Sequence, residues 1–321
     1  MIFVNINYRL YLRYIIGISV VCALIYHVHS QEDIIPVLSQ FDFSVLLPAL
    51  MIIAMHLLCL LIMWKNIVCS IGEMRPGYLL LCHSFLGGRA LGFITPGHTG
   101  ELLKGMFFTS GVRLKGTSLS MIYAGYGMLV RTILGLIASI YFILKIQILY
   151  EINMKSLAII FTIIFLSVII VFLLLIKGRI MGHIERYFPA KILKLLCLFK
   201  SQLQSKSLSQ FVYLLAMALA ANLLAVLAFI VILFGFNIHV MNIQGFMAFE
   251  AAYFAMSLLP ITPSGIGIRE GSRIYFFSLI GCSQTAILCA SVIMFGLNIM
   301  LPAILGIGSL KYFWQQESEN P

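Results

Sequence analysis

Residues 259–271 read LPITPSGIGIREG and interrupt one of the most apolar parts of the chain. The two prolines and three glycines break helical geometry, because proline lacks a backbone N–H and glycine is a poor helix former. Arg269 and Glu270 then add charge in a setting where charge is costly. A charged helix break inside an apolar stretch predicts a segment whose backbone polar groups face protein or a water-filled cavity rather than lipid.

The composition of the whole chain sets its class. Of 321 residues, 61% are hydrophobic and only 10% are charged, whereas charged residues make up about 25% of an ordinary soluble domain. Several apolar runs approach the roughly 20 residues that a helix needs to cross a bilayer. The sequence therefore predicts an all-α polytopic membrane protein. No metal-ligand, nucleotide-phosphate or nucleophile motif stands out, so we expect no metal, no cofactor and no catalytic residue.

The apolar runs predict about six full transmembrane helices, at residues 11–29, 45–64, 118–144, 156–176, 209–235 and 284–312. Two further stretches, 77–117 and 243–283, each contain a break, and we expect them to be re-entrant helical hairpins. Seven or eight spans are the alternative if these stretches cross fully. Basic residues in the short loops place both termini in the cytoplasm. The connector 177–208 carries seven basic residues against one acid, which predicts a cytoplasmic segment.

The opening motif occurs twice. ITPGHTG at 94–100 matches ITPSGIG at 261–267, and each copy is followed by a glutamate and a base. The predicted helix-break residues are Thr95, Pro96, Gly97, Gly100, Thr262, Pro263, Gly265 and Gly267. An odd number of predicted spans lies between the copies, which predicts an inverted repeat within a single transmembrane domain, 1–321. Repeat one covers about 45–144 and repeat two about 209–312, although a simple proline kink in each stretch is the alternative.

Charged and titratable residues in these segments are the candidate substrate-binding groups: Arg269, Glu270, Arg273, Glu101, Lys104, His98, Arg131 and Arg89. A lysine or arginine here suits a phosphate, and arginine offers a bidentate fork. Glu101 and Glu270 would pair with these bases or meet a cationic group on a lipid. For Arg89 and Arg131, an ion pair that fixes helix packing is an equal alternative. His98 could couple protons or be an ordinary hydrogen-bonding residue.

Three motifs together resemble the lysylphosphatidylglycerol synthase transmembrane-region family, also described as flippase-like membrane proteins. They are TPGHTGELLKG at 95–105, LVRTILGL at 129–136 and LLPITPSGIGIREG at 258–271, and the resemblance covers nearly the whole chain. It extends to the membrane half of the multiple peptide resistance factor. The resemblance implies an integral protein of the bacterial or archaeal cytoplasmic (inner) membrane, whose best-understood relatives move a modified phospholipid between leaflets.

Two departures from the family pattern change what the resemblance implies. Family members often have Glu-Arg where this chain has Val130-Arg131, so an expected partner of Arg131 is missing. No soluble aminoacyl-transfer domain follows the membrane region, and we therefore do not expect a lysyl-lipid as the substrate.

The residues and the resemblance together predict a flippase-like lipid transporter that moves an anionic phospholipid or lipid-linked headgroup, and not an enzyme. One alternative is an intramembrane enzyme acting on lipid phosphates, with His98 or a glutamate as its base. The other is a non-transporting membrane partner of a glycosyltransferase or lipid synthase, docked through the connector 177–208. The expected partners are membrane lipids, together with such an enzyme in the last case, and no nucleic acid.

Overall fold

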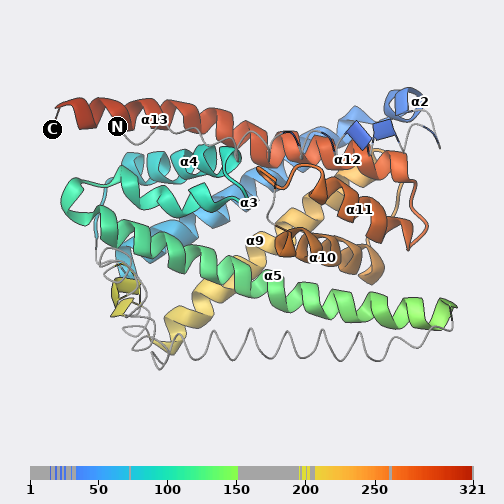
Figure 1. Cartoon of the computed structure of the whole chain (residues 1–321), viewed down its shortest axis with the longest axis horizontal. Helices are drawn as coiled ribbons and strands as arrows, with labels where there is room; N and C mark the ends of the chain where they lie inside the picture. Colours follow the sequence, from blue (N-terminus) through green and yellow to red (C-terminus); the bar gives the residue numbers. More distant parts are fainter. Residues whose placement is uncertain are drawn as a thin grey trace.

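The computed structural model describes residues 34–71, 74–150, 207–259 and 262–319, with a few further positions at 15–30 and 195–202. The predicted spans 11–29 and 156–176 and nearly all of the connector 177–208 lie outside the described residues. Within the described ranges all regular elements are helices (Figure 1). The principal α-helices are α2 (Ile34–Ser39), α3 (Leu46–Asn66), α4 (Tyr78–Ile94), α5 (Arg113–Tyr150), α9 (Leu208–Phe234), α10 (Ile243–Leu258), α11 (Ile268–Ser278), α12 (Gln284–Phe295) and α13 (Leu301–Glu319).

Four helical segments are long and apolar enough to cross a membrane: Phe43–Ile71, Arg113–Lys145, Leu208–Phe234 and Gln284–Lys311. Two of them contain a π-helical turn, at Ile67–Ile71 after α3 and at Gly296–Met300 between α12 and α13. The four segments match the apolar runs predicted at 45–64, 118–144, 209–235 and 284–312, with two of them ending one residue earlier than predicted. The prediction of an all-helical, multi-pass membrane protein is therefore confirmed.

The two interrupted stretches are helix–break–helix units, which we call the first and second hairpins. In the first, α4 is followed by the 3₁₀ helix η3 (Thr99–Phe107), which packs back against α4. In the second, α10 is followed by α11, which packs back against α10. The first hairpin ends earlier than predicted, because α5 already begins at Arg113. Figure 1 shows the two hairpins toward opposite ends of the molecule, with their breaks near its middle.

The helices pack in a pattern that is the same in both halves of the chain. α3 and α9 are the long helices that precede the first and second hairpins, and they pack against each other. α4 packs against α13, and α10 packs against α5, so each hairpin begins with a helix that contacts the last long helix of the other half. The second arm of each hairpin contacts the long helix that follows it, η3 with α5 and α11 with α12. Exchanging the two halves therefore leaves this set of contacts unchanged.

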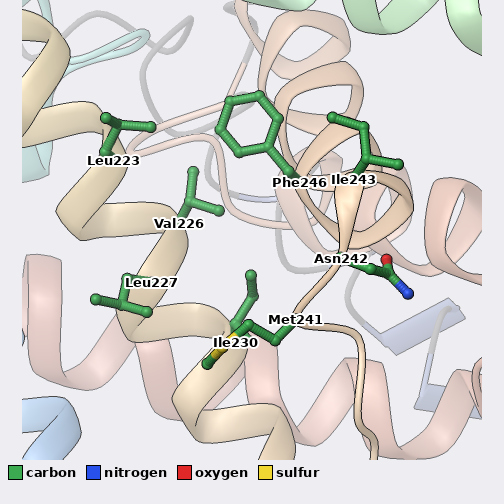
Figure 2. A pocket seen from close by; sticks show the side chains of 8 residues that line it. All are labelled: Leu223, Val226, Leu227, Ile230, Met241, Asn242, Ile243 and Phe246. Atoms are coloured by element: carbon green, nitrogen blue, oxygen red, sulfur yellow. The ribbon is translucent and has the colours of Figure 1, made fainter.

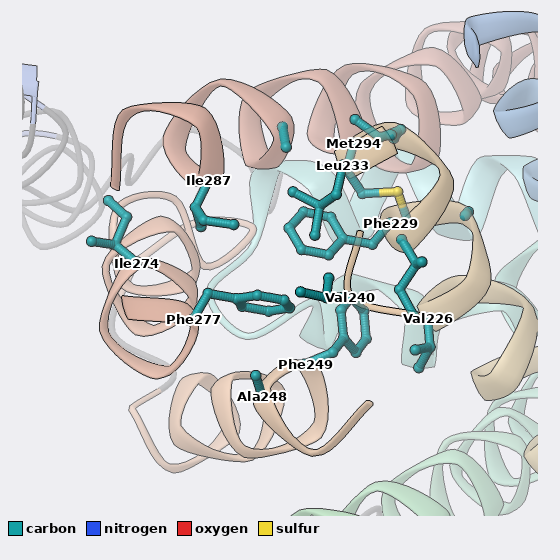
Figure 3. Packing of buried hydrophobic residues seen from close by; sticks show 14 of the residues in the cluster. Val226, Phe229, Leu233, Val240, Ala248, Phe249, Ile274, Phe277, Ile287 and Met294 are labelled. Carbon is teal, nitrogen blue, oxygen red and sulfur yellow. The ribbon is translucent and has the colours of Figure 1, made fainter. Parts of the chain in front are cut away.

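An aromatic core holds the second hairpin in place. Phe229 of α9, Phe249 of α10 and Phe277 of α11 point toward one another, with Ile287 of α12 beside them (Figure 3). The ring of Phe229 lies 5.5 Å from that of Phe249 and 5.4 Å from that of Phe277, measured between centroids. Aromatic rings at this separation add to the stabilisation from buried area. The core fixes α11, which also carries Arg269 and Arg273.

The contact between α13 and α4 depends on Gly306. A Cβ atom built at Gly306 would lie 2.1 Å from the backbone oxygen of Leu86, whereas one at Gly308, two residues along the same helix, meets no atom within 4 Å. Small residues allow membrane helices to approach this closely. We expect Gly306→Ala to destabilise the protein by about 1–3 kcal/mol and Gly308→Ala not to destabilise it. Thermal unfolding midpoints in detergent check this, and equal midpoints for the two variants would contradict it.

Candidate functional site

The two helix breaks meet. Pro96 of the first break and Pro263 of the second form an isolated antiparallel β-bridge. The bridge joins residues that are far apart in the sequence but occupy the same position in the two motifs. The candidate site is therefore one composite region, to which both halves of the chain contribute.

The two breaks also share one backbone conformation. The φ angles are 58° and 59° at Gly97 and His98, and 50° and 69° at Ser264 and Gly265. In each copy the amide N–H three residues after the proline donates to the proline carbonyl, at 3.2 Å and 3.1 Å respectively. Two consecutive positive φ angles closed by this bond are the pattern of a type I′ turn. The repeated sequence motif therefore specifies a repeated turn, in which His98 and Ser264 adopt a conformation that non-glycine residues rarely adopt.

Side chains satisfy the backbone groups that the breaks leave free. The Thr95 hydroxyl accepts a hydrogen bond from the Gly100 N–H at 2.6 Å and donates to the Leu91 carbonyl at 3.0 Å. The Ser264 hydroxyl donates to the Phe93 carbonyl at 2.7 Å and so ties the second break to the end of α4. An interrupted helix is tolerated inside a membrane when its free polar groups are satisfied in this way.

Not every predicted break residue adopts the turn conformation. Thr262 and Pro263 are buried in the second break, and Gly267 caps α11 with a φ angle of 84°. Gly100 instead lies one residue inside η3, and its missing side chain allows η3 to approach the backbone of Leu91. The role of Gly100 is close packing within the first hairpin.

In the first hairpin, three charges form a compact group. Glu101 accepts hydrogen bonds from Lys104 at 3.0 Å and from Arg89 of α4 at 3.1 Å. Lys104 is fully buried, and its Nζ lies 3.7 Å from the centre of the Tyr123 ring. The structure thus brings together Glu101 and Lys104, as their spacing predicts, and adds Arg89 from across the break. Lys104 is the least accessible of the predicted phosphate ligands.

In the second hairpin, Arg269 and Glu270 pair with each other at the start of α11. One Glu270 oxygen accepts from Nε of Arg269 at 2.9 Å and also from Nη2, while the other accepts the Gly267 N–H at 2.7 Å. The Arg269 guanidinium also lies 4.4 Å from the centre of the Phe295 ring. The positive end of the α11 dipole is thereby neutralised by a carboxylate from its own first turn.

Arg273 lies one turn further along α11 and faces the aromatic core, with its guanidinium 4.4 Å from the centre of the Phe229 ring. Arg269 and Arg273 are each 3% exposed. A guanidinium nitrogen of each, and the Thr262 hydroxyl, have no hydrogen-bond partner among the described residues. Buried donors normally have a partner, so these unused donors could accommodate a group with acceptor oxygens.

Two further predicted site residues, His98 and Arg131, lie beside these charges. His98, in the turn of the first break, interacts electrostatically with Glu101 of its own hairpin and also with Arg269 of the second. Arg131 of α5 lies over the Tyr253 ring, with its guanidinium 4.9 Å from the ring centre. Because Arg131 packs against α10, we expect an acidic partner for it on that helix rather than at position 130.

The one acid on α10 is Glu250, which lies three residues before Tyr253 and which sequence reasoning did not place among the candidate residues. Glu250 is 1% exposed on α10, accepts a hydrogen bond from Asn222 of α9 at 2.5 Å and interacts electrostatically with Arg131. The signal in the sequence is a single acid inside the apolar stretch GFMAFEAAYFAM, but nothing in that stretch indicates the helix that it faces.

The charges around the meeting point do not balance. We define the break cluster as the bases Arg89, Lys104, Arg131, Arg269 and Arg273 with the carboxylates Glu101, Glu250 and Glu270. Five bases thus face three carboxylates in this part of the described chain, all of them buried or half-buried. A surplus of positive charge with unused guanidinium donors is suited to an anion that carries several oxygens.

An apolar groove lies between α9 and α10 (Figure 2). Its volume is about 350 Å³, and it is lined by Leu223, Val226, Leu227, Ile230, Met241, Asn242, Ile243 and Phe246. Asn242 is the one polar side chain in this lining, and its oxygen accepts the Gly245 N–H at 2.9 Å at the start of α10. The groove is therefore suited to hydrocarbon rather than to a headgroup. The described residues contain no group of three metal-ligating side chains.

One family model matches the chain. Its description is lysylphosphatidylglycerol synthase TM region, and the match covers residues 14–306. The matched region contains both hairpins, the break cluster and the groove, so the family resemblance expected from the three motifs is confirmed. No curated protein and no solved structure matches the chain.

Proposed function

The chain belongs to the lysylphosphatidylglycerol synthase transmembrane-region family, and on this premise we propose that it moves an anionic lipid headgroup across the membrane through its paired helix breaks. The observation that carries the proposal is the break cluster, in which five bases face three carboxylates where the breaks meet. Buried charge without a counter-ion is strongly unfavourable. A phosphate group would supply the missing negative charge and accept from the unused guanidinium donors of Arg269 and Arg273.

The two hairpins are, in this proposal, re-entrant segments of an inverted repeat. Three observations support a two-fold relation between the halves. They are the shared turn, the Pro96–Pro263 bridge, and a set of helix contacts that stays the same when the halves are exchanged. In transporters of this type the substrate site lies at the repeat interface, and one repeat moves against the other to expose it. The repeats are the predicted 45–144 and 209–312, in a bacterial or archaeal cytoplasmic membrane with both termini on the cytoplasmic side.

In this proposal the buried break cluster represents a closed state of the transport cycle. Arg269, Glu270 and Arg273 expose 3%, 4% and 3% of their surfaces, so a headgroup reaches them only after the hairpins part. The groove between α9 and α10 would hold an acyl chain, because it is apolar and because α10 also begins the second hairpin. A lipid bound in this way would have its phosphate in the break cluster and one chain along α9.

Mass spectrometry of the lipids that copurify with the protein tests the proposal. We expect one anionic lipid class to be enriched with the wild type and reduced about tenfold or more in Arg269→Gln, because charge-assisted hydrogen bonds contribute about 1.5–3 kcal/mol each. Arg269→Lys should show an intermediate loss, since it keeps the charge but not the bidentate fork. The same anionic enrichment in all three proteins would refute the site.

The matched control for these variants is Lys65→Gln. Lys65 is an equally basic residue at the end of α3, half-buried, whose ammonium donates to the Tyr78 hydroxyl at 2.6 Å and lies outside the break cluster. It should retain the wild-type lipids. A monodisperse size-exclusion profile for each protein separates loss of lipid from loss of fold. Bulk membrane lipid in the wild type as well would instead favour the non-transporting partner of a glycosyltransferase or lipid synthase.

The enzyme alternative makes a different prediction for the same preparation. If the purified protein converts an added lipid phosphate and His98→Ala abolishes this activity, the enzyme hypothesis is favoured over transport. We expect no turnover, because His98 and Glu101 lie beside bases that neutralise a phosphate rather than beside a nucleophile.

A further inference from the structure

Glu250 has a hydrogen-bonding pattern that does not fit an ionised carboxylate. One of its oxygens accepts from Asn222, while the other is buried and has no hydrogen-bond partner in the described part of the chain. An ionised carboxylate has two acceptor oxygens, and burying it with a single neutral donor is strongly unfavourable. A protonated carboxyl group is uncharged, so burying it with a single hydrogen bond costs much less than burying the carboxylate.

The charged groups around Glu250 come from two of the three helices that pack on α10. α5 brings Arg131, whose guanidinium lies 4.9 Å from the centre of the Tyr253 ring, one helical turn from Glu250 on α10. α9 brings Asn222 but no charged side chain. α11 brings Arg269, Glu270 and Arg273. Arg269 and Glu270 are paired with each other, and Arg273 faces aromatic rings. Arg131 is therefore the base whose charge Glu250 is placed to modulate.

We propose that Glu250 is a proton-binding site that controls how strongly Arg131 attracts an anion. It thereby couples headgroup binding to proton uptake. A proton taken up from water forms an O–H bond on the free Glu250 oxygen and removes one negative charge from the break cluster. Arg131 then faces the anion without a competing carboxylate. Release of the proton restores the carboxylate, which competes for Arg131 and weakens the binding of the anion.

This coupling is reciprocal by thermodynamic necessity. If protonation raises the affinity for the anion by a given factor, binding of the anion raises the affinity of Glu250 for the proton by the same factor. Couplings of this kind typically amount to about 5–150-fold. The part of the proposal that concerns the anion rests on the proposed function, whereas protonation of Glu250 does not.

Infrared spectroscopy of the purified protein in lipid nanodiscs tests the protonation directly. A protonated carboxyl group has a C=O stretching band distinct from those of carboxylates and amides. We expect a pH-dependent band of this kind in the wild type that is absent in Glu250→Gln. If Glu250→Gln does not fold, Asn222→Leu serves instead, because loss of its hydrogen bond should shift the same band. Identical spectra in wild type and variant would overturn the proposal.

Binding of phosphatidylglycerol, with phosphatidylcholine as the neutral comparison, tests the coupling. Between about pH 5 and about pH 9 we expect wild-type affinity for phosphatidylglycerol to fall about fivefold or more as the pH rises, because Glu250 loses its proton. Glu250→Gln should bind with the high affinity of the protonated form at every pH. A pH dependence that persists in Glu250→Gln but is lost in His98→Gln would assign the proton to His98 and overturn the proposal.

The matched control is Asp42→Asn, which removes an exposed carboxylate outside the break cluster. Hydrogen bonds from the backbone and hydroxyl of Ser44 lower the pKa of Asp42 below its ordinary value, so Asp42 stays ionised throughout the range tested. Its variant should keep the wild-type pH dependence. If the proposed function is wrong, phosphatidylglycerol and phosphatidylcholine bind equally at every pH. The infrared band still reports, independently of this, whether Glu250 binds a proton.

Discussion

Gly100→Ala is expected to destabilise the protein by about 3 kcal/mol, at the upper end of the usual cost of overpacking. A Cβ atom at this position would lie 2.2 Å from the Leu91 oxygen and 2.8 Å from the Gly92 nitrogen. Both are backbone atoms, which cannot rotate away as a side chain can. Relief requires η3 to move away from α4, and this also breaks the bond from the Gly100 N–H to Thr95.

The same substitution should also remove bound anionic lipid, because Glu101 follows directly in η3. If η3 moves, Glu101 separates from Arg89 and the break cluster loses its arrangement. Thermal unfolding in detergent and the copurified lipids measure the two effects. Gly111→Ala is the matched control, since a Cβ atom there meets nothing within 4 Å. A Gly100→Ala protein that unfolds at the wild-type temperature and keeps its lipid would show that the first hairpin does not need this close contact.

The sequence predicted the parts of this fold that depend on local chemistry. The long apolar runs identify the four membrane-competent helices because length and hydropathy are sufficient for that purpose. The repeated ITP motif identifies the two breaks because proline and glycine act on the backbone locally. The spacing of Glu101 and Lys104 identifies an ion pair because residues three apart on a helix are neighbours.

The contacts that assemble the site could not be predicted in the same way. Pro96 and Pro263 meet only because of how all the helices pack, and no local pattern in either motif encodes the other as its partner. Arg131 packs over the Tyr253 ring on α10 rather than pairing with a residue at position 130. The start of α11 is neutralised by Glu270 itself, which depends on a side-chain conformation. Each of these features belongs to tertiary structure.

Arg269 and Glu270 could serve only to fix the second hairpin, and a double-mutant cycle distinguishes that role from binding. We expect Arg269→Gln and Glu270→Gln each to destabilise the protein by about 3–5 kcal/mol, because each leaves its partner as an unpaired buried charge. The double variant should be more stable than either single variant, since it contains neither buried charge and the amide oxygen introduced by Glu270→Gln can still accept the Gly267 N–H. Unfolding midpoints of the four proteins measure this.

Lipid retention in the same four proteins should follow a different order. The double variant recovers stability but not the guanidinium, so we expect it to copurify with as little anionic lipid as Arg269→Gln does. Stability and binding then separate, which an ion pair used only for packing cannot produce. If the double variant regains both stability and anionic lipid, Arg269 is a packing residue and the headgroup binds elsewhere in the break cluster. If Glu270→Gln alone destabilises the protein only slightly, water reaches the Arg269–Glu270 pair. The closed state of the second hairpin is then more open than the 3% and 4% exposures of these two residues indicate.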